Sequence, residues 1–131
     1  MPYFNQETFL LAVKKGGLDS QEYIDALATN LRLSRAEGID QIMKQHKLDA
    51  LVAPSGGPAW LTDFIKGDNS GGGFSSAAAV AGYPHITVPA GTVYGLPVGI
   101  SFVGAAWSEP TLIKLAYSRA PTFVKTVNPQ V

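Results

Sequence analysis

A stretch rich in glycine and proline, residues 81–104, constrains the fold more than any other part of this sequence. It contains two β-type runs, 86–88 and 98–103, each bounded by prolines and glycines that limit where a strand can begin and end. The second run alternates bulky with smaller residues, so one face of the strand permits close packing. Such runs are typical of a hairpin or strand pair. We therefore predict that the two runs pair and that Pro89 ends the first strand.

Helical spacing dominates the chain before this pair. Apolar residues predict a short helix over 4–13 that stops before a Gly-Gly breaker. A longer helix is predicted to begin at Asp19, where Glu22 completes a capping box, and to run to about Gln45. The N-terminal third is thus expected to be helical.

The remaining segments are short and separated by turn residues. The apolar run 48–53 is stopped by a proline and predicts a buried strand, and a loop is expected to follow it. Residues 74–81 predict an alanine-rich helix that Gly82 closes in the left-handed conformation. Ser108 is expected to cap a last helix that Pro121 ends.

Composition narrows the class of protein. With 131 residues and 46% hydrophobic content, the chain has the size and make-up of one domain, 1–131, divided into a helical arm (1–47), a sheet-and-helix portion (48–120) and a tail (121–131). Ten acidic and ten basic residues give a net charge of zero, which disfavours nucleic acid and anionic membranes as partners. The absence of cysteine excludes disulfides, thiolate metal sites and a cysteine nucleophile. No secretory leader pattern is found, so a cytoplasmic location is expected.

Two glycine-rich runs are the first candidates for chemistry. Ser55-Gly56-Gly57 and Ser70-Gly71-Gly72-Gly73 could offer a nucleophile or backbone N–H groups for a developing negative charge. Neither serine lies in a strand–turn–helix elbow, and no lysine or threonine follows as in a phosphate loop. Turn and cap chemistry is therefore favoured, while a serine hydrolase using Ser55 or Ser70 with a lysine or His85 stays open as a third hypothesis.

The other candidates are isolated polar or aromatic residues. Neither His46 nor His85 has a second ligand at metal-binding spacing, so no metal or cofactor is expected and a packing role is favoured for His85. Asp63 and Asp68 lie in a loop, where surface or turn roles are favoured over a carboxylate pair. Trp60 could line a pocket, although core packing is the more common role.

Several motifs in order resemble the C-terminal part of the amidase signature family, near its bacterial peptide-amidase branch. The resemblance covers nearly the whole chain and is strongest over 38–117. Its motifs are LDALVAP (48–54), GGPAW (56–60), AGYP (81–84), ITVPAG (86–91), GLPVGISFVG (95–104) and WSE (107–109). Two departures are His85, where the family has a small residue, and SRAP at 118–121, where the last helix commonly has Glu-Gln-Ala-Thr.

The resemblance implies an α/β fold, with a few-stranded mixed sheet packed with helices, and an amidase activity. Family members hydrolyse amides through a serine, a second serine in a cis peptide and a lysine, and no residue of this chain matches any of the three. We therefore expect scaffold and pocket wall, inactive alone, with Gly57, Pro58, Trp60 and Asp63 nearest a small-molecule or peptide amide held together with an N-terminal portion.

The alternative is a non-catalytic protein that binds itself or a partner. A piece of a larger sheet would carry unpaired strand edges and an uncovered apolar face, and both recruit other chains. A homodimer or higher oligomer is therefore expected.

Overall fold

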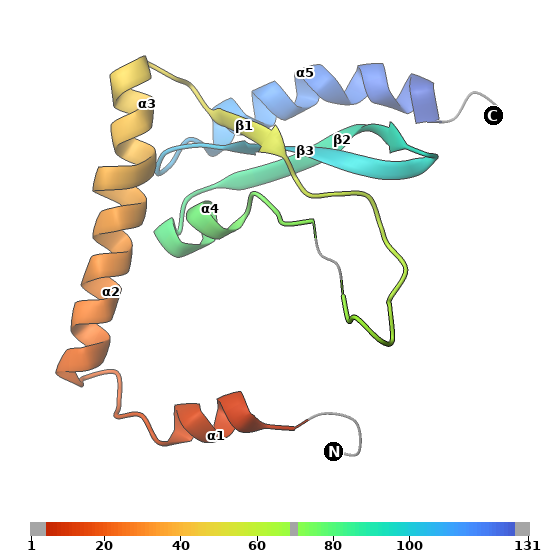
Figure 1. Cartoon of the computed structure of the whole chain (residues 1–131). Helices are drawn as coiled ribbons and strands as arrows, with labels where there is room; N and C mark the ends of the chain where they lie inside the picture. The colour runs from red at the N-terminus through yellow and green to blue at the C-terminus, as the bar shows by residue number, and fades with distance from the viewer. Residues whose placement is uncertain (1–4, 69–70, 128–131) are drawn as a thin grey trace.

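The computed structural model describes residues 5–68 and 71–127 and shows a long helical arm beside a small sheet (Figure 1). The elements in chain order are α1 (Glu7–Val13), α2 (Gln21–Ser34), a π-helical segment η1 (Arg35–Ile39), α3 (Asp40–His46), β1 (Leu51–Pro54), α4 (Ser76–Ala81), β2 (His85–Val93), β3 (Leu96–Val103) and α5 (Glu109–Val127). The predicted α/β class, a few-stranded sheet packed with helices, is confirmed.

The sheet has the order β1-β3-β2, and both of its ladders are antiparallel. The parallel pairing of a mixed sheet is thus absent from the described strands. The predicted strand pair is confirmed: β2 and β3 form a hairpin whose turn residues, Tyr94 and Gly95, have φ values of 52° and 79°. Two successive positive φ values are typical of the type I′ turn, whose twist matches that of paired strands.

The predicted end of the first strand at Pro89 is wrong, because β2 continues to Val93. The register shifts between Pro89 and Gly91, which marks a β-bulge. A bulge leaves one residue unpaired, and β2 is an edge strand, so the missing N–H of proline disrupts only part of the ladder.

The helical arm, α2–η1–α3, differs from the prediction at its start. Ser20 rather than Asp19 is the N-cap, and it makes no side-chain capping bond, so the predicted capping box is wrong. Glu22 instead accepts a 2.6 Å bond from Lys15 Nζ. Inside the arm Gly38 has the non-helical angles φ −114° and ψ −108°, which produce a kink before the helix resumes and ends at His46.

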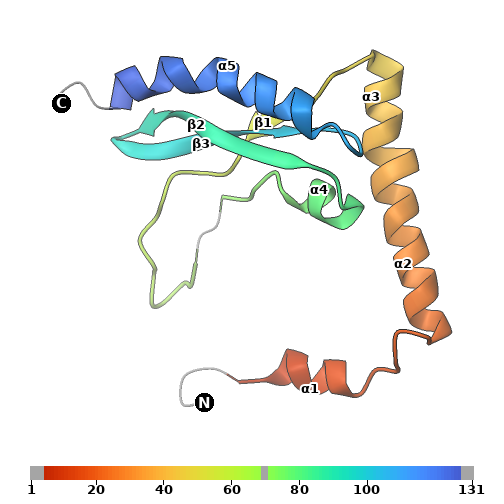
Figure 2. The same ribbon diagram turned by 180° about the vertical axis from the view of Figure 1, so that it is seen from behind.

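The core lies on both faces of the sheet (Figures 1 and 2). On one side, Val103 of β3 clusters with residues from the arm and α4; these are Ile39, Met43, Ala78 and Ala81. On the other side, α5 buries Leu112 and Ala116. Because neighbouring residues of a strand point to opposite faces, the buried Phe102 faces the α5 side.

A polar cluster fastens the arm to the α4–β2 connection. Tyr83 Oη donates a 2.8 Å bond to Asp40 Oδ2, and Arg35 Nε donates a 2.7 Å bond to the carbonyl of Ala81. The Arg35 guanidinium also lies over the Tyr83 ring, 5.5 Å from its centre. Burial and the Asp40 carboxylate raise the pKa of Tyr83, although Arg35 lowers it. The predicted left-handed Gly82 is confirmed at φ 66° and ψ 34°, and it directs the chain into this cluster.

The last helix, α5, is longer than predicted. It begins directly after Ser108, whose hydroxyl donates to the carbonyl of Ala105, and it continues through Pro121 to Val127. The predicted end at Pro121 is therefore wrong. Proline removes one backbone bond and weakens a helix locally, but the bonds on either side can carry the helix past it. Residues 128–131 of the predicted tail lie outside the described residues.

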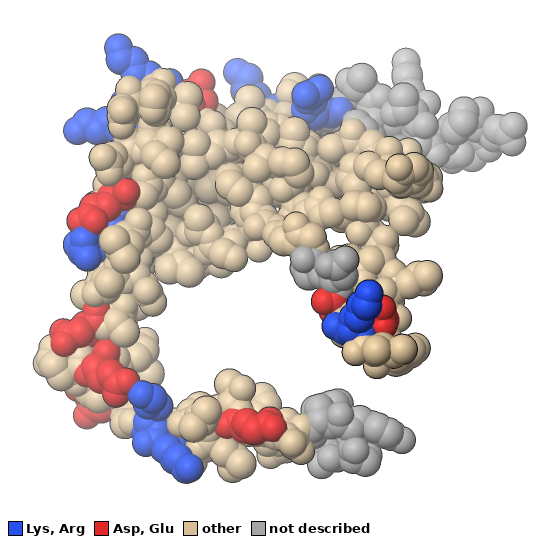
Figure 3. Space-filling model, viewed as in Figure 1, with Lys and Arg blue, Asp and Glu red and all other residues tan. Residues whose placement is uncertain are grey.

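The arm and a loop after β1 extend to the same side of the sheet. Helix α1 lies apart from the sheet in both ribbon views, and none of its residues is buried. In the space-filling view the arm, the sheet layer and the loop surround a hollow (Figure 3).

Candidate functional site

The two glycine-rich runs meet below the end of β1. Gly56 and Gly73 form an isolated antiparallel bridge, and the N–H of Phe74 donates a 3.3 Å bond to the carbonyl of Ser55. The N–H of Ser55 donates a 2.9 Å bond to the carbonyl of Gly99 on β3. The tertiary structure therefore brings the runs together and ties both to the sheet. Ser70, the other serine considered as a nucleophile, lies outside the described residues.

Three hydroxyl groups form a closed ring where these runs join the sheet. Ser101 Oγ donates a 2.7 Å hydrogen bond to Ser55 Oγ. Ser55 Oγ in turn donates a 3.4 Å hydrogen bond to Thr87 Oγ1. Thr87 Oγ1 is 3.0 Å from Ser101 Oγ and completes the ring. Because Ser101 is fully buried, the ring satisfies a hydroxyl that water cannot reach.

The contacts of Ser55 in this ring do not suit a nucleophile. A serine nucleophile needs a general base within hydrogen-bonding reach. Among the described residues, the side-chain partners of the Ser55 hydroxyl are other hydroxyls. The geometry supports a positioning role, in which Ser55 holds the Gly56-Gly57 run against the sheet.

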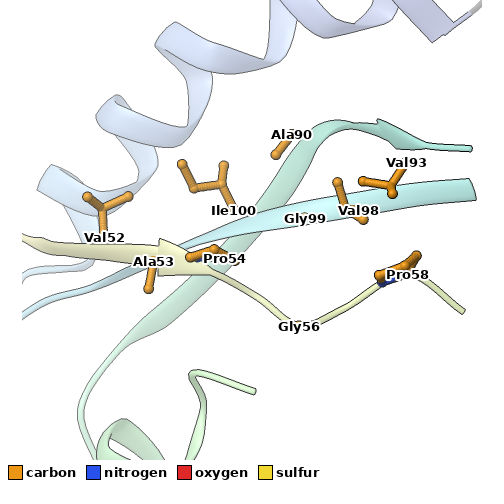
Figure 4. Close-up of a pocket in the computed structure, with 10 residues that line it drawn as sticks. All are labelled: Val52, Ala53, Pro54, Gly56, Pro58, Ala90, Val93, Val98, Gly99 and Ile100. Atoms are coloured by element: carbon orange, nitrogen blue, oxygen red, sulfur yellow. The ribbon is translucent and has the colours of Figure 1, made fainter. Parts of the chain in front are cut away.

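An apolar pocket of about 490 Å³ lies beyond the end of β1, against the β2–β3 hairpin (Figure 4). Its wall comes from β1, the following run, and the hairpin, and it comprises Val52, Ala53, Pro54, Gly56, Pro58, Ala90, Val93, Val98, Gly99 and Ile100. No charged side chain is among these residues, so the pocket suits an uncharged apolar group.

The four residues predicted to contact substrate fall into two groups. Pro58 lines the apolar pocket, and Gly57 is exposed next to it in the chain. Trp60 and Asp63 lie further out, in the loop 59–68, and each makes contacts within that loop. Trp60 Nε1 donates a 3.3 Å hydrogen bond to Asp68 Oδ1, and Trp60 is 48% exposed.

Asp63 organises the tip of the loop. Its Oδ1 accepts bonds from the N–H groups of Ile65 (2.8 Å) and Lys66 (2.9 Å), and its carbonyl accepts from the N–H of Gly67. The bonds from Lys66 and Ile65 lower the pKa of the Asp63 carboxyl below the ordinary value of 3.8.

Acid is expected to loosen the loop tip in a defined range of pH. The pKa of Asp63 is lower in the folded loop than in the unfolded chain. The carboxylate therefore stabilises the loop tip above pH 3.8, and this stabilisation is lost as the pH falls through the lower folded pKa. The amide resonances of Ile65 and Lys66 should then shift together in an NMR titration. Asp63→Asn should remove this titration, whereas Asp49→Asn should keep it. A titration that persists in Asp63→Asn would contradict the assignment.

His85 is the second polar feature near the sheet. Its Nε2 is buried and has no hydrogen-bond partner among the residues that the structure describes, and His85 borders a small cavity of about 190 Å³ together with Glu109 and Leu112. His85 is thus the first residue of β2 and borders a cavity that α5 also lines, but its unpartnered Nε2 does not fit a hydrogen-bonded packing histidine.

Sequence reasoning missed the hydroxyl ring and most of the apolar pocket. Thr87 of β2 and Ser101 of β3 are directly opposite each other in the antiparallel ladder. The small face predicted for β3 was the available signal, but it indicated only close packing. The pocket residues are ordinary strand residues and carry no signal of their own.

The described residues hold neither a metal-binding cluster nor a membrane-spanning helix. Among residues 5–68 and 71–127, no group of three or more His, Asp or Glu side chains is arranged to hold a metal ion. Within the same residues, no helix has the length and apolar character to cross a membrane.

Solved structures of peptide amidases contain a segment similar to this chain. A peptide amidase in complex with the competitive inhibitor chymostatin matches 96% of this chain with a TM-score of 0.88 and 47% sequence identity. This chain belongs to the amidase signature family. The native peptide amidase of Stenotrophomonas maltophilia gives a TM-score of 0.79 and 48% identity over 91% of the chain. The match extends over 26% and 24% of those amidase chains, respectively.

Two curated relatives of the amidase signature family also match most of this chain. A probable amidase of Arabidopsis thaliana is 38% identical over 88% of this chain, and a putative amidase of Schizosaccharomyces pombe is 31% identical over 93%. The chain spans 19% and 21% of the length of these two relatives. No family model matches the chain.

Proposed function

We propose that this chain forms the C-terminal scaffold and pocket wall of an amidohydrolase that cleaves a carboxamide. The observation that carries the proposal is the superposition of nearly the whole chain on one quarter of a peptide amidase at 47% identity. The reaction proposed is acyl transfer from the amide to a serine, with loss of the amine, followed by transfer to water. The serine, its cis-peptide partner serine and the lysine would come from the remaining portion of the fold.

The residues of this chain would act by positioning. The hydroxyl ring holds the run Ser55–Gly57 on the sheet, and Pro58 extends that run along the apolar pocket. In this proposal Gly57 and Pro58 contact the substrate, while Trp60 and Asp63 shape the loop beyond them. The apolar lining favours an amide that carries an uncharged apolar group.

Amide turnover with and without the missing portion tests the proposal. The purified chain is expected to release no ammonia from peptide amides. Adding the N-terminal three quarters of the Stenotrophomonas maltophilia peptide amidase should produce turnover, and the same addition with its nucleophilic serine changed to alanine should not. Turnover by the chain alone, or a complex with no turnover, would overturn the proposal.

A second candidate function is self-assembly without catalysis, and the exposed apolar surface favours it. Large apolar side chains stand in solvent on α1, on α2 and at the hairpin tip; examples are Phe9, Leu11, Ile24 and Tyr94. A homodimer or higher oligomer is then expected in sedimentation velocity. A single monomeric species at high protein concentration would count against this candidate.

A further inference from the structure

The loop 59–68 presents three large apolar side chains to solvent. Leu61, Phe64 and Ile65 are 94%, 97% and 95% exposed. Single exposed apolar residues are common on protein surfaces, but a contiguous group of them marks an interaction surface. These three lie within five successive positions of one loop, and the described part of the chain leaves all of them almost fully exposed.

Polar contacts within the loop hold these side chains outward. Asp63 binds the N–H groups of Ile65 and Lys66, and Trp60 binds Asp68 across the base of the loop. The apolar pocket near Pro58 would offer burial, but none of the three apolar side chains lines it. The loop therefore has a defined shape that keeps its apolar tip away from its own domain.

The position of the loop indicates what covers it. It projects from the sheet on the same side as α1, and the hollow in Figure 3 lies between them. Leu10 of α1 and Leu18 of the turn after it are also exposed apolar residues, at 60% and 74%. The matched peptide amidase has about three quarters of its chain outside the matched region, since the match covers 26% of it.

We propose that Leu61, Phe64 and Ile65 form a docking tip that inserts into an apolar site on the N-terminal portion of an amidase fold. The inference rests on the proposed function, because that function requires such a portion. It adds the contact: an uncharged apolar tip, held in shape by Asp63 and Trp60, anchors the two portions to each other.

Two matched double variants test the docking tip. Phe64→Ser with Ile65→Ser removes an aromatic and an aliphatic group from the tip. Ile113→Ser with Tyr117→Ser removes the same kinds of group from the exposed side of α5, on the other face of the sheet, where they are 59% and 75% exposed. Unchanged circular dichroism and melting temperature would show that both variants fold.

The probe is the N-terminal three quarters of the Stenotrophomonas maltophilia peptide amidase, immobilised for a binding measurement. The tip variant is expected to weaken binding by about 100-fold, since two apolar side chains lose their burial, and the α5 variant by less than about 3-fold. Equal affinities of the two variants for the probe would overturn the inference. It would also be overturned if the wild-type chain did not bind the probe and the tip variant lost self-association, because the tip would then contact a second copy of this chain.

A chimera keeps the test decisive if the probe does not fold by itself. Joining this chain to the N-terminal three quarters of the peptide amidase should give a protein whose melting temperature falls in the tip variant and not in the α5 variant. A complex that forms through the tip but shows no amide turnover would overturn the proposed function alone. Turnover with full retention of binding by the tip variant would overturn the docking inference alone.

Discussion

Replacing Leu112 by alanine is expected to lower the free energy of unfolding by about 2–5 kcal/mol. Leu112 is 1% exposed and is among the largest fully buried side chains of the described residues. Its Cδ2 lies 3.3 Å from the point that a Cβ on Gly104 would occupy, so it packs tightly where β3 leads into α5. Truncation would leave a cavity between α5 and the sheet, in a core that contains few large side chains.

Denaturant unfolding, followed by circular dichroism, measures this effect. Ile113→Ala is the matched control because Ile113 is the next residue of the same helix and is 59% exposed. Its effect should stay within about 0.5 kcal/mol. Similar losses for both variants would mean that α5 does not pack on the sheet as described.

Replacing Gly99 by alanine is the second large effect, with an expected loss of about 1–3 kcal/mol. An added Cβ would stand 2.8 Å from Ser55 Oγ and 2.9 Å from Thr87 Cγ2, and both distances are too short for packed atoms. The strand would have to shift or the hydroxyl ring would have to open. Because Ser55 carries the Gly56-Gly57 run, the pocket wall would move with it.

Two further variants separate crowding from the loss of the ring. Gly57→Ala is the control for added bulk, since no atom of the described residues lies within 4 Å of its Cβ position, and it should leave stability nearly unchanged. Ser101→Ala breaks the ring without adding bulk and should cost about 1 kcal/mol while raising hydrogen exchange at the amide of Ser55. If Gly99→Ala were as stable as Gly57→Ala, the close packing of the ring would be refuted.

Much of the fold could be predicted because local chemistry determines it. The β2–β3 hairpin, the left-handed Gly82 and the helical arm follow from turn residues and apolar spacing. The errors lie where a local rule was outweighed. Pro89 was predicted to end a strand, but a bulge at the sheet edge accommodates it, and α5 continues through Pro121.

The site was predictable only in part. Pro58 lines the apolar pocket, whereas Trp60 and Asp63 make their contacts inside the loop, and contact of any of them with a substrate stays a prediction. The hydroxyl ring joins residues from β1's end, β2 and β3, which are far apart in the chain. Their spacing in sequence therefore carries no signal.

The sequence by itself determined the turns, the helix and strand periods and the ordered motifs of the amidase signature family, because each depends on residues close together in the chain. Only the tertiary structure decided that Ser55, Thr87 and Ser101 share a ring, that Leu112 is buried while Ile113 is not, and that the tip of loop 59–68 stands in solvent. These outcomes depend on how distant segments pack, and packing is a property of the whole arrangement rather than of any short stretch.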